Sequence, residues 1–198
     1  MSKTTKDNTV SDWELVQRFN QGDKSAFRVL TDKYAQRAYQ IAFGVLRNRE
    51  DAEEVAQDAF VRIYKALPSF RGEAEFTTWM YRIVVNLSRN KYRWKKTRGF
   101  KRETSMDQPI EDNEGNQITV DVEEPRSQPD EETQFHELQN RVEQEMNNLP
   151  PAYREALILR NVEEMNYDQI AEVLGCKLGT IKSRIARARE ELRRRLEL

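Results

Sequence analysis

The stretch from 167 to 192 constrains the fold most, because it contains two short apolar helical stripes separated by one glycine. Residues three and four apart lie on the same face of a helix, so each stripe predicts an amphipathic helix. Gly175, between the stripes, can adopt the left-handed backbone that a tight turn needs. The pattern therefore predicts a helix-turn-helix. Its apolar residues are Ile170, Ala171 and Leu174 in the first helix, and Ile181, Ile185 and Ala188 in the second.

The second of these helices carries polar and cationic side chains on its other faces, among them Ser183, Arg184 and Arg187. Such a helix fits the major groove of DNA, where Arg and Lys reach phosphates and guanine edges. Lys177 stands at the expected N-cap, where a cation is unfavourable unless a phosphate lies nearby. The alternative interpretation is an ordinary helical hairpin with a solvated basic face.

Charge is unevenly divided along the chain, although the formal net charge is only −1. Residues 82–102 contain nine Lys or Arg and no acid, and residues 177–198 contain eight basic and three acidic residues. Residues 103–132, between them, contain eleven Asp or Glu and one basic residue. An even distribution would argue against a nucleic-acid partner, whereas two separate basic blocks favour one.

Several functional classes are made improbable by what the sequence lacks. Its one cysteine, Cys176, excludes an internal disulfide and fits a reducing compartment. The longest uncharged run is the nine residues 38–46, far short of a membrane span, and the amino terminus has no secretory core. We therefore expect a soluble cytoplasmic protein without membrane insertion. Paired cysteines, a phosphate loop and a nucleophile elbow are absent. The single histidine, His136, is more typical of a surface position, so we expect no catalytic residue, cofactor or metal.

Helical patterns dominate the remainder, which predicts an all-α protein. Ser11, Asp23 and Asn48 or Glu50 are expected to begin three helices, and Pro68 to end the third. Residues 68–75 resemble a loop, and 103–133 have prolines with little apolar periodicity, which is typical of a flexible linker. We therefore predict two small helical domains joined by an acidic flexible linker, the second containing the helix-turn-helix. The predicted ranges are a flexible terminus at 1–10, domains at 11–100 and 134–198, and a linker at 101–133.

A fourth helix is expected over residues 76–95, with a polar and basic stripe beside its apolar face. Cations and amides with neighbouring aromatic rings suit unpaired nucleic acid, whose bases stack on such rings. The alternative, to which we give equal weight, is a core-facing aromatic set with a solvated basic end. The stripe comprises Arg82, Asn86, Arg89 and Arg93, and the nearby aromatic residues are Tyr81, Tyr92 and Trp94.

Several motifs in fixed order resemble one known family over nearly all of the chain. They are Gly-Asp-Lys-Ser-Ala-Phe at 22–27, Asp-Ala-Glu-Glu-Val-Ala-Gln-Asp-Ala-Phe-Val at 51–61, Phe-Arg-Gly-Glu-Ala-Glu-Phe-Thr-Thr-Trp-Met-Tyr-Arg-Ile at 70–83, Leu-Pro at 149–150 and Gly-Thr-Ile-Lys-Ser-Arg-Ile at 179–185. The sequence resembles the extracytoplasmic-function class of bacterial RNA polymerase sigma factors (group 4, sigma-E-like). Each motif alone is weak, but their order and spacing are specific.

The resemblance implies three binding surfaces, none of them catalytic. The third helix would bind the clamp coiled coil of the largest subunit of the polymerase core; the matching residues are Glu54, Val55, Gln57 and Asp58. The loop and fourth helix would capture a flipped base of the promoter's minus-10 element; the candidates are Phe70, Arg71, Tyr81, Arg82, Asn86, Arg89, Asn90 and Arg93. The helix-turn-helix would read the minus-35 element; the candidates are Lys177, Thr180, Lys182, Ser183, Arg184 and Arg187. Trp79 is expected in the core rather than against a base.

The resemblance thus implies a transcription initiation factor that melts promoter DNA, controls a regulon such as a stress response, and is regulated by an anti-sigma factor. The main rival is a freestanding helix-turn-helix regulator, which would leave the first domain without a role. A structural RNA-binding protein is the other rival among binding proteins, and a helix suited to duplex DNA argues against it.

Overall fold

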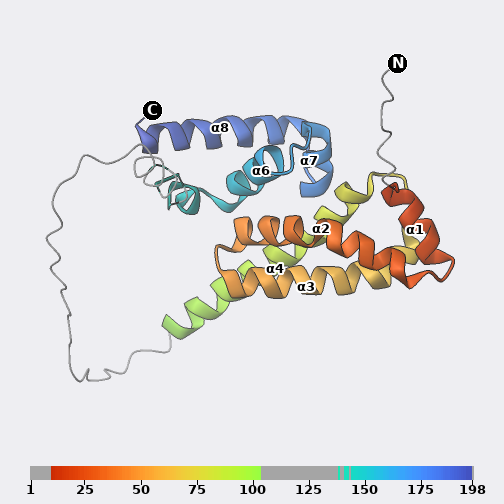
Figure 1. Cartoon of the computed structure of the whole chain (residues 1–198). Helices are drawn as coiled ribbons and strands as arrows, with labels where there is room; N and C mark the ends of the chain where they lie inside the picture. The colour runs from red at the N-terminus through yellow and green to blue at the C-terminus, as the bar shows by residue number, and fades with distance from the viewer. Residues whose placement is uncertain (1–9, 104–137, 139–140, 143, 198) are drawn as a thin grey trace, which may run out of the picture.

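The computed structural model describes residues 10–103, 138, 141–142 and 144–197, and every regular element in these ranges is a helix (Figure 1). The predicted all-α fold is therefore confirmed. The first group of elements comprises α1 (Asp12–Asn20), α2 (Lys24–Leu46), α3 (Arg49–Ala66), the 3-10 turn η1 (Leu67–Ser69) and α4 (Phe76–Glu103). The second comprises α6 (Pro151–Asn161), α7 (Tyr167–Leu174) and α8 (Leu178–Leu196).

The helices begin where local chemistry favours a start. The side chains of Ser11, Asp23 and Asn48 accept backbone hydrogen bonds at the amino ends of α1, α2 and α3, as the sequence predicted. Pro68 lies in η1, immediately after α3. Gly175 ends α7 with φ of 64°, which confirms the predicted turn. Lys177 caps α8 without a side-chain hydrogen bond, also as predicted.

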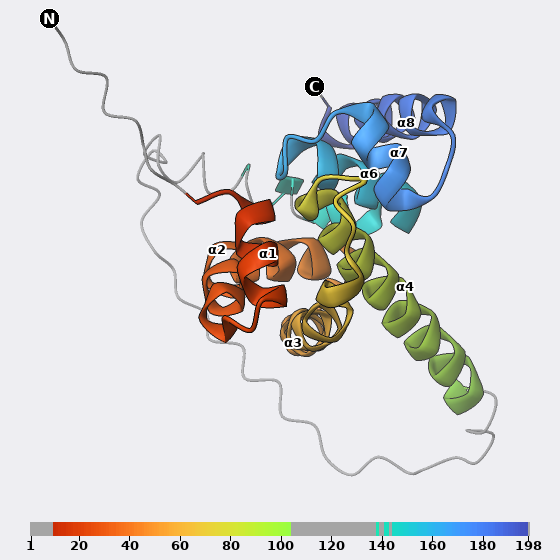
Figure 2. The same cartoon turned by 90° about the vertical axis from the view of Figure 1, so that its right-hand side faces the viewer.

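The predicted end of the fourth helix is wrong, because α4 continues to Glu103 instead of ending near residue 95. Lys and Arg are good helix formers, so the basic segment can continue the helix without packing. This end of α4 projects beyond the other helices (Figure 2). The acidic linker predicted at 101–133 lies outside the described residues beyond the last turn of α4, as do His136 and residues 1–9.

The amino-terminal helices enclose an apolar core to which every one of them contributes. Leu15, Leu30, Ile41, Ile63 and Met80 are each at most 1% exposed. In the carboxyl-terminal group, Leu159, Ile170, Ile181 and Ile185 are buried to the same degree. The predicted apolar faces of α7 and α8 are thus the faces that pack inward, which leaves their polar faces available for contacts.

The two groups of helices pack against each other, with α6 on α2 and α7 on α4 (Figure 2). Gly44 in α2 permits this approach, because a Cβ there would lie only 2.2 Å from Cδ1 of Ile158 in α6. The guanidinium of Arg154, also in α6, donates to the carbonyl of Val45 at 3.4 Å. The helix-turn-helix therefore rests on the amino-terminal helices, and this contact affects the site described next.

Candidate nucleic-acid interface

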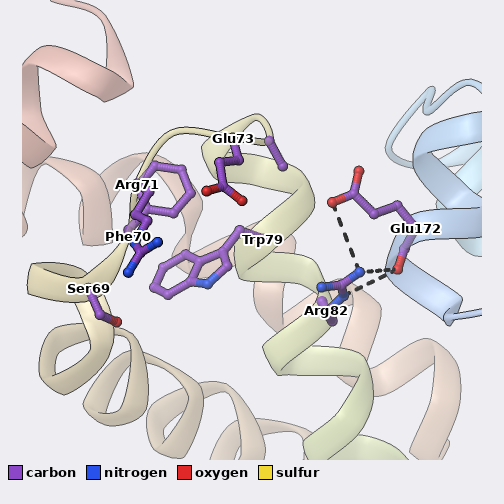
Figure 3. Close-up of a pocket in the computed structure, with 8 residues that line it drawn as sticks. Ser69, Phe70, Arg71, Glu73, Trp79, Arg82 and Glu172 are labelled. Carbon is purple, nitrogen blue, oxygen red and sulfur yellow. Dashed lines mark hydrogen bonds and ion pairs between the residues drawn. The ribbon is translucent and has the colours of Figure 1, made fainter.

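A cavity of about 420 Å³ opens where the 70–75 loop meets the start of α4. Figure 3 shows the indole of Trp79 between the Phe70 and Arg71 side of the cavity and the guanidinium of Arg82. Aromatic surface and two guanidinium groups are what an unpaired base with its phosphate requires. The cavity lining comprises Ser69, Phe70, Arg71, Glu73, Ala74, Trp79, Arg82 and Glu172.

Aromatic packing fixes the shape of this cavity. The ring of Phe70 lies 5.0 Å from that of Trp79 and 6.0 Å from that of Phe76, measured between centroids. Phe70 is only 9% exposed, so it supports the loop more than it offers a surface. Trp79 is half-buried and lines the cavity, so the expectation that it belongs to the core describes only part of its position. Its neighbours Met80 and Ile83 indicated the core, and no sequence signal indicated the cavity.

The predicted basic stripe on α4 is exposed except at Arg89, which is half-buried. Arg82, Asn86, Asn90 and Arg93 are exposed, and a guanidinium nitrogen of Arg93 donates to the Asn90 side chain at 2.7 Å. Tyr81 is different, since it is 2% exposed and its hydroxyl donates to Glu163 of the other helical group. Burial, together with this hydrogen bond, raises the pKa of Tyr81 above its usual range. Tyr81 is therefore not presented to a partner in this arrangement.

Two of the predicted cations are engaged by the carboxyl-terminal helices. Arg82 donates to the carbonyl of Glu172 at 2.9 and 3.2 Å, and Arg89 forms a bidentate pair with Glu155, the shortest distance being 2.6 Å. Glu155 is 4% exposed, and its hydrogen bonds raise the pKa of Arg89 above the ordinary value. Glu172 lines the cavity but comes from α7, so reasoning along the sequence could not have placed it there. We call this arrangement, in which the two groups of helices are packed together, the closed form. In it the carboxyl-terminal helices occupy part of the candidate surface.

The contact between the two groups combines apolar packing, as between Gly44 and Ile158, with buried polar groups that are not all paired. Glu163 has a side chain that is 1% exposed, and its Oε1 has no hydrogen-bond partner among the described residues. The same holds for Nε of Arg154, a residue that is 4% exposed. Burial lowers the pKa of Arg154, and the nearby charge of Arg47 adds to this effect. Buried charges without full partners make a contact costly, so a marginally stable contact is expected.

The polar face of α8 is open to solvent, in contrast to the stripe on α4. Lys177, Lys182, Ser183 and Arg187 are exposed, and Thr180 and Arg184 are half-buried. Within the described part of the chain, the charged groups of Lys182 and Arg187 have no side-chain partner. Arg194 and Arg195, nearer the end of the helix, both pair with Glu191. The first half of α8 therefore offers the free positive charge that a phosphate backbone would neutralise.

The third predicted surface, on α3, is acidic and mostly exposed. Glu54, Gln57 and Asp58 are exposed, and Glu54 accepts from Nζ of Lys91 at 2.6 Å. Val55 is only 4% exposed and packs in the core, so its side chain cannot contribute to a surface here. The candidate surface on α3 is thus restricted to the three polar residues.

No group of three or more His, Cys, Asp or Glu in the described residues is arranged to hold a metal ion. None of their helices combines the length and the apolar character needed to cross a membrane.

Two family models match the chain, one over much of each group of helices. Residues 30–98 match the model for Sigma-70 region 2, and residues 139–192 match the model for Sigma-70, region 4. Among curated proteins, the RNA polymerase sigma-H factor of Pseudomonas aeruginosa is 36% identical over 189 residues, and 94% of each chain is covered. The ECF RNA polymerase sigma factor SigW of Bacillus subtilis is 33% identical, with 91% of this chain and 94% of the relative covered.

Two solved structures share the fold over most of both chains. CnrH, in complex with the cytosolic domain of CnrY, aligns with a TM-score of 0.64 and 23% identity, covering 94% of this chain and 97% of that chain. The sigma factor RpoE of Bartonella quintana, in complex with the anti-sigma factor NepR, aligns with a TM-score of 0.60 and 23% identity, covering 87% and 97%. At this level of identity the likeness establishes the two-part helical fold alone.

Proposed function

Because the chain belongs to the ECF sigma factors of bacterial RNA polymerase, we propose that its two helical domains divide promoter recognition between them. A sigma factor is a transcription initiation factor that directs the polymerase to promoters. The division of labour rests on one observation: an aromatic and cationic cavity and a free cationic helix lie on different domains. The proposed ranges are 11–100 for minus-10 recognition, 101–133 for the linker and 134–198 for minus-35 recognition.

The amino-terminal domain captures an unpaired base of the minus-10 element in the cavity at the start of α4. Removing a base from the stack costs a few kcal/mol, so a pocket and a basic path must compensate. Trp79 supplies ring surface, and Arg71 and Arg82 supply charge at the rim. Asn86, Asn90 and Arg93 continue the path along α4, and Arg89 joins them once it leaves Glu155. Phe70 and Tyr81 act from within, by holding the loop and the helix.

The carboxyl-terminal domain reads the minus-35 element by placing the first half of α8 in the major groove. Lys182 and Arg187 are positioned to bind phosphates or guanine edges, because no intramolecular partner competes within the described residues. Thr180, Ser183 and Arg184 line the same end of the helix, and Lys177 stands at its N-cap. Lys177 is placed to neutralise a phosphate beside the first turn of α8.

The third surface, formed by Glu54, Gln57 and Asp58 on α3, binds the clamp coiled coil of the largest polymerase subunit. We infer no chemistry for the chain itself, since the polymerase would catalyse RNA synthesis. Its place of action is the cytoplasm, where the polymerase works. An anti-sigma factor is a further proposed partner, because the solved relatives include a sigma factor held by one. Such a partner can stabilise the closed arrangement, in which Arg82 and Arg89 are already engaged.

Reconstitution with purified polymerase core tests this proposal. Core with the chain should form a stable complex and produce run-off transcripts from a small set of templates in a genomic promoter library, whereas core alone should not select them. Trp79→Ala should reduce opening of the selected promoters while binding of core persists. If the chain instead binds its DNA sites as a dimer and never associates with core, the freestanding regulator is correct and the proposal fails.

A further inference from the structure

Trp13 in α1 is in an unusual position for a large apolar side chain. It is 43% exposed, although it begins the apolar side of its helix in the sequence. Its ring does not enter the core and instead packs against the 70–75 loop. A large aromatic side chain held at a loop that forms a cavity wall requires an explanation beyond core packing.

The contact with the loop is close and depends on a glycine. Gly72 has φ of 73°, a conformation that side chains rarely adopt. A Cβ there would lie 2.8 Å from Cζ3 and 3.1 Å from Cη2 of Trp13. The six-membered ring of the indole thus occupies the space of the missing side chain, and the glycine allows both the turn and the contact.

The indole ring of Trp13 is connected to the candidate base cavity through the ring of Phe70. The rings of Trp13 and Phe70 meet edge to face, with centroids 6.0 Å apart, and Phe70 lies against Trp79, which lines the cavity. A second hollow of about 370 Å³, on the Trp13 side, shares Phe70 and Ala74 with the base cavity. The loop is therefore a thin wall, and Trp13 supports it from the side opposite the proposed base.

The helix that carries Trp13 is itself anchored at that point. The neighbouring Asp12 accepts from Nζ of Lys33 at 2.7 Å and from the hydroxyl of Tyr34, both in α2. Burial, together with the hydrogen bond to Asp12, raises the pKa of Tyr34 to about 12, so this donor persists at neutral pH. Asp12 and Glu75 also line the hollow beside Trp13, which has no Lys or Arg among the described residues of its lining. In the base cavity, by contrast, Arg71 and Arg82 accompany the carboxylates of Glu73 and Glu172. This side of the loop is thus suited to support and not to binding the DNA strand.

We propose that Trp13 is a positioning residue for promoter opening, which braces the loop through Gly72 and Phe70 so that the base cavity is preformed. This inference rests on the proposed function, because it assigns a role in minus-10 capture to a residue that does not touch DNA. A preformed wall spares the cost of ordering the loop when the base enters. Loss of the brace should therefore slow opening and leave the other two surfaces intact.

The test compares holoenzymes that contain the full chain or its variants on a promoter selected from the library. Trp13→Ala should reduce open-complex formation on duplex DNA about fivefold, which is the range of an aromatic pair. Trp13→Phe, which keeps a ring against Phe70, should recover most of the loss. Gly72→Ala displaces the Trp13 ring and also strains the turn, so it should lose at least as much as Trp13→Ala. Val29→Ala, at a residue that is 48% exposed on α2, is the matched control and should not change opening.

Two further readouts separate a positioning role from a merely structural one. Affinity for core and for a duplex carrying only the minus-35 element should be unchanged in Trp13→Ala. The defect should shrink on a template whose minus-10 region is already unpaired. Opening at the parent rate by both Trp13→Ala and Gly72→Ala would overturn the inference, as would an equal loss of core binding. If the parent chain itself opens no promoter, the proposed function fails instead, so the two failures are distinguishable.

Discussion

At the scale of single residues, Arg184 and Arg187 differ from Arg194 and Arg195 of the same helix in what surrounds them. Arg187 is exposed without a side-chain partner in the described part of the chain, and Arg184 has only the sulfur of Cys176, at 3.8 Å. Arg194 donates to Glu191 at 2.9 Å. Free guanidinium groups can neutralise phosphates, whereas a paired one must first give up its carboxylate.

We therefore predict that Arg184→Ala and Arg187→Ala each weaken binding of a minus-35 duplex by holoenzyme about fivefold or more, since a bidentate base contact contributes about 1–3 kcal/mol. A residue that binds phosphate should also lower the slope of log affinity against log salt by about 0.9. Binding titrations at several salt concentrations measure both effects. Arg194→Ala is the control and should retain affinity and slope. Equal losses in all three variants would indicate that helix charge alone matters.

At the scale of elements, α8 begins with a cation where a cap is preferred. The N-cap Lys177 makes no side-chain hydrogen bond, whereas Asn166 caps α7 through both halves of a capping box. Lys177→Ser should stabilise the folded chain by about 1 kcal/mol, because Ser accepts an unpaired backbone N–H and removes charge from the positive helix end. The same change should lower affinity for the minus-35 duplex, since a phosphate contact is lost.

Thermal unfolding of the Lys177→Ser variant measures the gain in stability, and titration with the minus-35 duplex measures the loss of affinity. Asn166→Ala is the reference, and should destabilise by a similar amount without a direct effect on the DNA-binding face. A Lys177→Ser variant that gains no stability would show that Lys177 is not a poor cap, and one that binds DNA as tightly as the parent would show that Lys177 is not a phosphate ligand.

The elements also show why some features were predictable and others were not. The caps at Ser11, Asp23 and Asn48 and the turn at Gly175 depend on chemistry within a few residues, so the sequence predicts them. α4 continues through Gly99 to Glu103, although glycine disfavours a helix interior, so neither apolar periodicity nor helix propensity predicts where it ends. The cavity position of Trp79 and the burial of Tyr81 and Val55 depend on which helix packs opposite, and Glu172 reaches the cavity only because α7 rests on α4.

At the scale of the whole molecule, the contact between the two helical groups is in competition with DNA. Arg82 and Arg89 are bound to Glu172 and Glu155, so these two cations become fully available to a DNA strand only when the groups separate. Partly unsatisfied charges at Arg154 and Glu163 weaken the closed form. A contact of this kind can open at modest cost, which suits the proposed division of promoter recognition between the two domains.

A substitution at Gly44 can shift the equilibrium between the closed form, with the two groups in contact, and an open form in which they are separated. Alanine in a helix interior is favoured over glycine by about 1 kcal/mol, but this gain is the same in the open and closed forms and cancels. The added Cβ would overlap Ile158 only in the closed form, being 2.2 Å from its Cδ1. Overpacking costs about 1–3 kcal/mol, so Gly44→Ala should shift the equilibrium toward the open form about 5-fold to 100-fold.

Small-angle scattering should then report a larger radius of gyration, and single-stranded minus-10 DNA should bind the free chain more tightly, because Arg82 and Arg89 are released. Adding Ile158→Ala to Gly44→Ala removes the overlapping atoms and should restore much of the closed form. Gly179→Ala is the control, because a Cβ there meets nothing within 4 Å. An unchanged radius of gyration in Gly44→Ala would mean that the helices adjust around the new methyl group. The contact between α2 and α6 would then not determine whether the two groups stay together. A larger radius without tighter single-strand binding would instead mean that separation of the two groups does not make Arg82 and Arg89 available to DNA. Binding of the minus-10 strand would then be limited by the amino-terminal domain itself.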